Sequence, residues 1–167
     1  YIESELESYG LEVDTQTFYG YIVNPSEVRV SVDMVSPNRL SLAVKENPQP
    51  WQERFDEISV GFNEGTPAGD VTAETVYANY GRAEDYEVLE ERGVSVEGKI
   101  VLVRHGGVQR GEKPYQAYIH GVAGLILYSD PADDGFVRGP VYPEGPWRAP
   151  DCIERGTVYR WTEYAGD

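Results

Sequence analysis

Two apolar runs separated by a glycine-rich turn place the strongest constraint on the fold of this chain. Residues 99–103, "KIVLV", and residues 125–128, "LILY", are short and almost entirely apolar, which is typical of strands buried on both faces. Between them lie the turn "GGVQRG" and a helical segment over residues 114–121, which begins at a proline suited to the first position of a helix. Strand, turn, helix and strand form a crossover unit, which predicts a parallel pair of central strands in one sheet.

The rest of the chain predicts strands of the other kind and one more helix. Residues 28–35, "VRVSVDMV", alternate apolar and polar side chains after the turn signal "NPSE", and this favours antiparallel pairing. Residues 84–92 predict a short helix with acidic residues in its first turn and Gly93 as its end. Together these patterns predict an α+β fold, in which a mixed β-sheet forms a sandwich or open barrel flanked by short helices.

The beginning of the chain has a different pattern. In "YIESELESYG", Ile2, Leu6 and Tyr9 share one helical face, but no capping residue precedes the helix. A strand-like segment follows over residues 12–23. We therefore expect the chain to be part of a longer protein.

The charge of the chain excludes one class of partner. Its 29 acidic and 14 basic residues give a net charge of −15. Long-range repulsion opposes DNA, RNA and anionic lipid surfaces, and we expect no nucleic-acid partner. The excess of carboxylates and the scarcity of lysine would suit a high-salt habitat, where ions screen the repulsion, but the solubility of an ordinary acidic protein explains the same composition.

The glycine turn at residues 106–111 has three interpretations. Such a turn can cradle a phosphate, reverse the chain, or hold one side chain toward a ligand. A phosphate-binding loop needs a lysine and a hydroxyl directly after its last glycine. Here Glu112 precedes Lys113, Pro114 replaces the hydroxyl, and a glutamate would repel a phosphate. Chain reversal and ligand binding remain.

Other residues that could carry chemistry have simpler explanations. Cys152 is the only cysteine, which excludes a disulfide within the chain and every multi-cysteine metal motif. The "HGG" motif at His105 is similar to an oxyanion loop, but no Gly-x-Ser-x-Gly motif supplies a nucleophile. Asp130, Asp133 and Asp134 lack the spacing of a calcium loop and favour a turn, with calcium binding as the alternative.

Long motifs of the second half carry a resemblance to a known family. They are "VYANYGRAEDYEVLEERGVSVEGKIVLVRHGG", "LILYSDPADDG" and "GPVYPEGPWRAPDCIERGTV". In this order they resemble the protease-associated (PA) domain of the glutamate carboxypeptidase II family, zinc peptidases of family M28 that include the transferrin receptor-like proteins. The resemblance implies that residues 24–167 form this domain. It also implies that residues 1–23 are a helix and strand of the neighbouring peptidase domain.

The resemblance also implies a division of labour within a longer protein. The PA domain caps the active-site cleft, whereas two zinc ions are expected in the peptidase domain of the same chain. These 167 residues are therefore expected to hold neither catalytic residues nor a metal. By the same resemblance, the complete protein would be a homodimeric zinc carboxypeptidase that acts outside the cell, in a periplasm or as a membrane-anchored ectodomain.

Three site residues follow from the resemblance. In the family, an arginine in the Arg-Gly turn after the buried strand binds the C-terminal carboxylate of a peptide substrate, and this arginine matches Arg110. Gln109 stands where the enzymes have an aromatic residue, and Thr157 replaces an asparagine that helps to hold the same carboxylate. A guanidinium offers a planar fork to a carboxylate, and flanking glycines let it project. From the residues alone, Arg110 could equally be a solvated turn residue.

Two functions of different classes remain open. One is the substrate-capping domain of an active zinc carboxypeptidase. The other is a binding or assembly module of a catalytically inactive, transferrin receptor-like protein. The residue preference of the site for its substrate is left undetermined.

Overall fold

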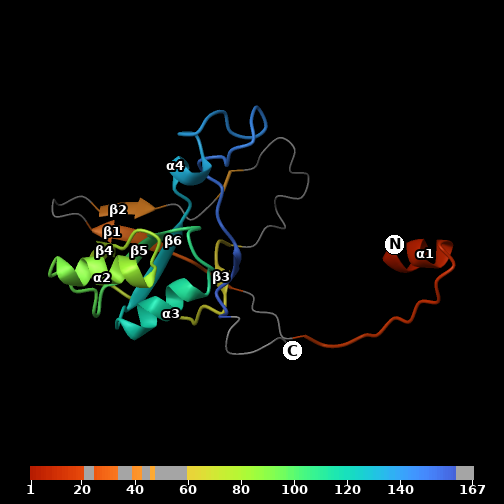
Figure 1. The fold of residues 1–167 in the computed structure, drawn as a ribbon, viewed down its shortest axis with the longest axis horizontal. Helices are drawn as coiled ribbons and strands as arrows, with labels where there is room; N and C mark the ends of the chain where they lie inside the picture. Colours follow the sequence, from red (N-terminus) through yellow and green to blue (C-terminus); the bar gives the residue numbers. More distant parts are fainter. Residues whose placement is uncertain (21–24, 34–38, 43–45, 48–59, 161–167) are drawn as a thin grey trace.

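A parallel three-stranded sheet forms the centre of the structure (Figure 1). The computed structural model describes residues 1–20, 25–33, 39–42, 46–47 and 60–160 of the chain. The sheet contains β4 (Thr75–Tyr77), β5 (Ile100–Arg104) and β6 (Gly124–Tyr128) in the order β4-β5-β6. The two apolar runs therefore pair in parallel within one sheet, as predicted, and each strand begins within one residue of the expected position.

Two helices connect these strands. The helix α2 (Ala83–Glu91) links β4 to β5, and α3 (Glu112–Ile119) links β5 to β6. Successive right-handed crossovers that move in one direction place both helices on the same face of a sheet. The side chains agree with this arrangement, because the ring of Tyr86 on α2 stacks on His120 at the end of α3 with 4.4 Å between ring centroids.

The core lies between the sheet and these helices. Val101 and Val103 of β5 are fully buried and cluster with Tyr86. The intervening residues of β5 and all of β6 are only half-buried. The expectation that both runs are central strands buried on two faces is therefore wrong for the second face of β5 and for β6. The helices cover only one face, and β6 lies at the edge of the sheet that the described residues form.

The helix boundaries show where a proline can stand. The predicted helix over residues 84–92 is confirmed within one residue. The helix α3 begins at Glu112, two residues before the prediction, so Pro114 is its third residue. A proline is tolerated there because the first amides of a helix have no carbonyl partner within it.

Two smaller sheets complete the described strands. β1 (Val30–Asp33) pairs with β2 (Arg39–Leu42) in antiparallel fashion, as the alternating pattern predicted. β3 (Asn63–Glu64) pairs in parallel with β7 (Gly156–Thr157), which brings a late segment of the chain back to its middle. Parallel and antiparallel pairs are thus both present, in separate small sheets.

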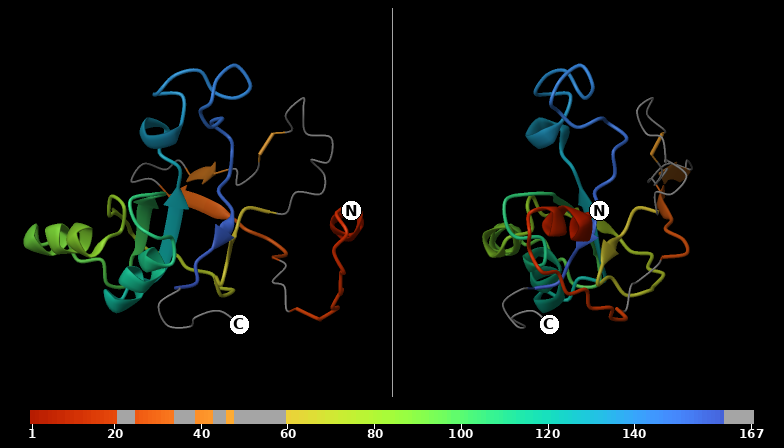
Figure 2. Two further views of the ribbon diagram at one scale, coloured as in Figure 1. Left: turned by 45° about the vertical axis from the view of Figure 1, so that its right-hand side comes forward. Right: turned by 90° about the vertical axis from the view of Figure 1, so that its right-hand side faces the viewer.

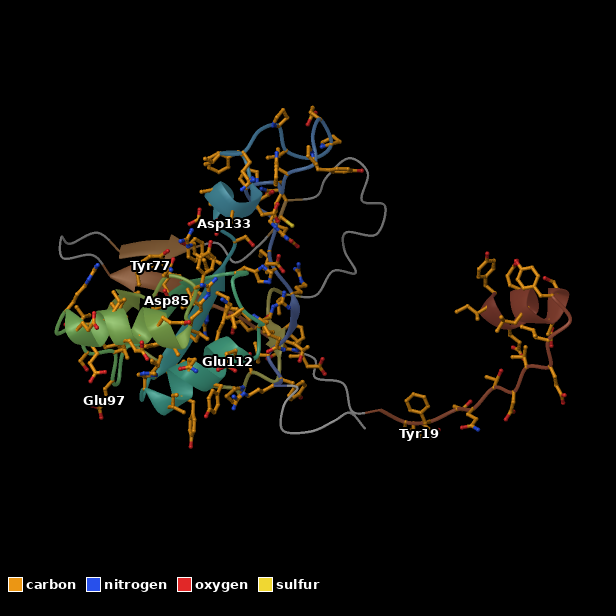
Figure 3. The ribbon with its side chains drawn as sticks, viewed as in Figure 1. Tyr19, Tyr77, Asp85, Glu97, Glu112 and Asp133 are labelled. Carbon is orange, nitrogen blue, oxygen red and sulfur yellow. The ribbon has the colours of Figure 1, made fainter. Side chains whose placement is uncertain are left out.

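The N-terminal segment lies apart from this body. The predicted helix is present as α1 (Ile2–Ser8), and an extended segment connects it to the rest of the chain (Figures 1 and 2). Tyr19 lies on this segment and is fully exposed (Figure 3). The strand predicted over residues 12–23 does not form at residues 12–20, where the described chain offers no partner strand, and residues 21–23 lie outside the described part. The division into residues 1–23 and 24–167 stays a prediction.

Candidate functional site

The glycine turn between β5 and α3 positions the candidate site. Gly106 and Gly107 have φ of 81° and 74°, in the left-handed region that favours glycine. A Cβ at Gly107 would also overlap the ring of Tyr80. The turn therefore requires glycine for its backbone shape, and it delivers Arg110 to the position just before α3.

Lys113 fixes the inner side of this turn. Its side chain is fully buried, and Nζ donates to the backbone carbonyls of Tyr80, Arg104 and Gly106. Burial lowers the pKa of Lys113 to about 8. A lysine that serves three carbonyls in the interior is not available to a phosphate, which agrees with the rejection of a phosphate-binding loop.

Arg110 lies on the outer side of the turn, against the Arg-Gly motif at residues 155–156. Its Nη1 donates to the carbonyl of Arg155 at 3.0 Å, and Nη2 donates to Glu154 at 3.1 Å. A Cβ at Gly156 would overlap the guanidinium, so only glycine lets Arg110 lie there. The side chain is 21% exposed, and the expectation of a projecting, exposed arginine is therefore wrong. The guanidinium is held by the carboxylate of Glu154 and the backbone carbonyl of Arg155.

Glu154 connects Arg110 to a second arginine. Its side chain is 14% exposed, and its Oε1 lies 2.5 Å from Nη2 of Arg148. Arg148 in turn contacts Asp134 through Nε at 3.0 Å. The carboxylate of Glu154 is thus shared by two guanidiniums in a partly desolvated position, where ion pairs are screened less than at the surface.

His105 completes the cluster. Nη2 of Arg110 lies 3.0 Å from its Nε2. Because a guanidinium can only donate, His105 accepts at Nε2 and carries its proton on Nδ1. Burial is the main cause that lowers the pKa of His105 below its ordinary value of 6.5, and Arg110 lowers it further, although Glu154 opposes the shift. The site therefore favours neutral His105.

The other two predicted site residues, Gln109 and Thr157, both form hydrogen bonds with Tyr159. Gln109 is exposed, and its Nε2 donates to the carbonyl of Tyr159 at 3.4 Å. Thr157 lies in β7, and its hydroxyl oxygen accepts from the amide of Tyr159 at 3.2 Å. The structure thus brings Gln109, Arg110 and Thr157 to one place, formed by the glycine turn and residues 154–159. Their role toward a substrate stays a prediction.

Sequence analysis missed Glu154 and Arg148. They lie 44 and 38 residues after Arg110, on irregular chain with no hydrophobic period. His105 was considered only for an oxyanion loop. A search for charged residues beside the Arg-Gly motif at residues 155–156 could have found Glu154, because it directly precedes Arg155.

The three aspartates after β6, at positions 130, 133 and 134, form hydrogen bonds that stabilise the chain around them. Asp130 caps the short helix α4 (Pro131–Asp134) by accepting from the amide of Ala132, and this hydrogen bond is the main cause that lowers the pKa of Asp130. Asp133, labelled in Figure 3, accepts from Tyr80 and Arg104. Among the residues that the structure describes, no group of three or more potential ligands could hold a metal ion.

A groove lies on the far side of Arg148. It has a volume of 310 Å³ and is lined by Trp147, Tyr142, Cys152 and the acidic residues Glu46 and Asp151, among others. Cys152, which forms part of this lining, is an exposed free cysteine. The groove and the Arg110 cluster share only Arg148 and its partner Asp134.

Comparison with known proteins places the chain in a family. The model of the PA domain matches residues 68–151. A probable glutamate carboxypeptidase of Arthroderma benhamiae is 40% identical over 110 residues, which cover 64% of this chain and 15% of that protein. An inactive zinc metalloprotease of Schizosaccharomyces pombe, C354.09c, is 32% identical over 163 residues, which cover 95% of this chain and 20% of that protein.

A solved structure supports the fold. The aminopeptidase from Aneurinibacillus sp. strain AM-1 has a TM-score of 0.52 and 23% identity to this chain, with 95% of this chain and 28% of that chain covered. This chain spans a fifth or less of the length of the two relatives named above. The resemblance and the α+β PA fold that it implied are confirmed. This chain belongs to the PA domain family, of the kind found in glutamate carboxypeptidase-like peptidases.

Proposed function

We propose that this chain is the non-catalytic PA domain of a glutamate carboxypeptidase II-like zinc metallopeptidase. In this function it caps the active-site cleft, and Arg110 binds the C-terminal carboxylate of a peptide substrate. The observation that supports the proposal most directly is the contact of 3.1 Å between Arg110 and the carboxylate of Glu154. The position already accommodates a carboxylate, which is the group to be recognised.

The electrostatic setting supports the same function. The chain as a whole has a net charge of −15. Arg110 and Arg148 nevertheless gather two positive charges around a single glutamate. Asp134 also contacts Arg148, so the cluster is close to neutral, and it repels an anionic group less than the acidic surface around it does.

Flanking polar groups add hydrogen-bonding capacity. The hydroxyl of Thr157 accepts from Tyr159 and keeps its own proton to donate. Gln109 keeps its amide oxygen as an acceptor. In the proposed function Arg110 binds the charge, whereas Thr157 and Gln109 orient the end of the peptide and its last amide group.

The hydrolytic chemistry belongs to another part of the complete protein in this proposal. The proposal assigns the two zinc ions to the peptidase domain of the same chain, because one relative is named as a zinc metalloprotease, although an inactive one. The contribution of this domain is to bind and orient the peptide and to exclude water from the cleft. A homodimer and a location outside the cell belong to the proposal. No helix of the described residues has the length and apolar character to cross a bilayer.

A second function has one observation in its favour. The relative from Schizosaccharomyces pombe is named as inactive, and its match covers 95% of this chain. This chain could equally serve as the binding or assembly module of an inactive protein. Zinc-dependent turnover of peptides by the complete protein would exclude that alternative.

The test of the proposal is Arg110→Ala in the complete protein. The probes are acetylated tripeptides that vary in their last residue, each as free acid and as C-terminal amide. We expect a loss of about 1.5 to 3 kcal/mol of binding energy for the free acids, the range for a hydrogen bond to a charged group. This corresponds to roughly 10- to 150-fold in kcat/KM, or in Kd if the protein is inactive. The amides should be unaffected.

The stability of this variant provides a control. Because Arg110 is paired with Glu154, its loss is expected to cost about 0.5 to 1 kcal/mol of folding stability, the range of a partly exposed ion pair. Arg110→Lys should recover only part of the binding, since it keeps the charge without the fork. Equal handling of the free acids by wild type and Arg110→Ala would contradict the proposed function.

A further inference from the structure

Glu154 occupies the part of Arg110 that a substrate carboxylate needs. A guanidinium has two edges that present a pair of N–H groups, and both edges include Nη2. In the structure, Nη2 contacts Glu154 at 3.1 Å and His105 at 3.0 Å. An incoming carboxylate therefore cannot form a two-pronged contact with Arg110 while Glu154 and His105 both stay in place.

The remaining donors of Arg110 do not offer a second site. Nη1 is engaged with the carbonyl of Arg155. Nε is buried and has no hydrogen-bond partner among the described residues. It lies on the edge that it shares with Nη2, so it can serve a carboxylate fully only when Glu154 releases Nη2. Two N–H groups of Arg110, the one on Nε and the second one on Nη1, are thus left for a ligand, but these atoms share no edge and cannot form a two-pronged contact.

Arg148 gives Glu154 an alternative partner. Its Nη2 lies 2.5 Å from the other oxygen of the same carboxylate. If Glu154 released Arg110, its charge would stay paired with Arg148. Breaking the contact to Arg110 therefore does not leave an unpaired charge in a half-buried place, which is the costly outcome for an ion pair.

We propose that Glu154 determines the affinity of this site, because its carboxylate competes with the C-terminal carboxylate of a peptide for Nη2 of Arg110. The inference rests on the proposed function of Arg110. It makes Glu154 an internal competitor, so that only a carboxylate presented at high local concentration, as at the end of a peptide bound in the cleft, displaces it. Free carboxylates of small molecules in solution are bound weakly.

The test compares Glu154→Gln with wild type in the complete protein. Glutamine has the same length and keeps a carbonyl acceptor for Arg148, but it lacks the charge that holds Arg110. With the acetylated tripeptides described above, Kd for the free acids is expected to fall roughly fivefold, since a neutral acceptor binds a guanidinium less tightly than a carboxylate does. Kd for the amides should not change.

Asp134→Asn is the matched control. It removes one negative charge from the same cluster, but Asp134 contacts Arg148 and not Arg110. If general electrostatics caused the effect, both variants would tighten the binding of free acids alike, and the inference would be overturned. The expected result is that only Glu154→Gln changes the ratio of Kd for amide over free acid. This ratio is taken within one variant, so a loss of folded protein affects both peptides equally.

Arg110→Ala distinguishes a failure of the proposed function of Arg110 from a failure of the role proposed for Glu154. If this variant keeps the preference of wild type for free acids, the proposed function of Arg110 is wrong. If Arg110→Ala abolishes the preference but Glu154→Gln leaves it unchanged or weakens it, then only the role of Glu154 is wrong. In the double variant, Glu154→Gln should have no further effect on the ratio, because the contested guanidinium is gone.

Discussion

Arg110 on the glycine turn and Lys113 at the start of α3 are neighbouring cations, and they have opposite kinds of partner. Lys113 is fully buried and binds three backbone carbonyls, which cannot move without the chain. Arg110 is partly exposed and binds the side chain of Glu154, which can rotate away. We therefore expect the inner side of the turn to stay fixed. In the proposed function, the outer side exchanges its partner.

The largest effect is expected on the inner side. Lys113→Met keeps an unbranched apolar chain but leaves the carbonyls of Tyr80, Arg104 and Gly106 without their donor. The expected loss is about 3 kcal/mol of unfolding free energy, the upper range for a buried polar group that loses its partner. Urea unfolding of the complete protein measures it, with Lys99→Met, at a partly exposed lysine paired with Glu74, as the control. A loss below about 0.5 kcal/mol, as at an ordinary surface position, would contradict the role of Lys113 as an anchor.

An intermediate effect is expected where the two sides meet. Gly156→Ala places a Cβ where the guanidinium of Arg110 lies, but the φ of Gly156 is not among the positive values that exclude alanine. The flexible end of Arg110 can yield, so stability should change by less than about 1 kcal/mol. Binding of peptides with a free carboxylate should weaken roughly tenfold, because the fork is displaced. A variant that binds as wild type does would show that Arg110 needs no support from this segment.

The smallest effect is expected from His105. Its pKa is lowered in the folded protein, so the unfolded chain binds the proton more tightly. The stability that neutral His105 contributes is present above pH 6.5 and is lost as the pH falls through the lower folded value. The difference in stability between wild type and His105→Gln should therefore shrink below pH 6.5. The measurement covers about pH 7.5 to about pH 5, on both sides of the ordinary histidine pKa. A stability difference between the two proteins that stays constant over this range would contradict the lowered pKa of His105.

The sequence predicted the fold where local patterns decide it. The apolar runs at β5 and β6 and the helices between the strands were placed within one or two residues, because hydrophobic period and end signals are local. The prediction of a strand was wrong at residues 12–20, because an extended segment becomes a strand only beside a partner strand, which a local pattern does not reveal. Likewise, β6 was expected in the centre of a sheet, because an apolar run does not reveal whether it has one neighbour or two.

The candidate site was predictable only in part. Arg110, Gln109 and Thr157 were found through motifs of a family, and the structure brings them together. The burial of Lys113 could not be predicted, because lysine is rarely buried. Nothing beside it in the sequence indicates that three backbone carbonyls accept hydrogen bonds from its Nζ. The pairing with Glu154 depends on how irregular chain returns to the turn, over a distance of 44 residues.

The separation of these contacts along the chain has a consequence for folding. Two of the carbonyls that Lys113 binds lie 7 and 9 residues away, whereas Arg110 reaches partners 44 and 45 residues away. Contacts between near neighbours close early, and those that span a long loop close late, because the loop entropy must be overcome first. The two short-range contacts of Lys113 can therefore form before residues 154–156 arrive. We expect Glu154 and Gly156 to join the structure last and to leave it first, so hydrogen exchange should be faster there than in β5.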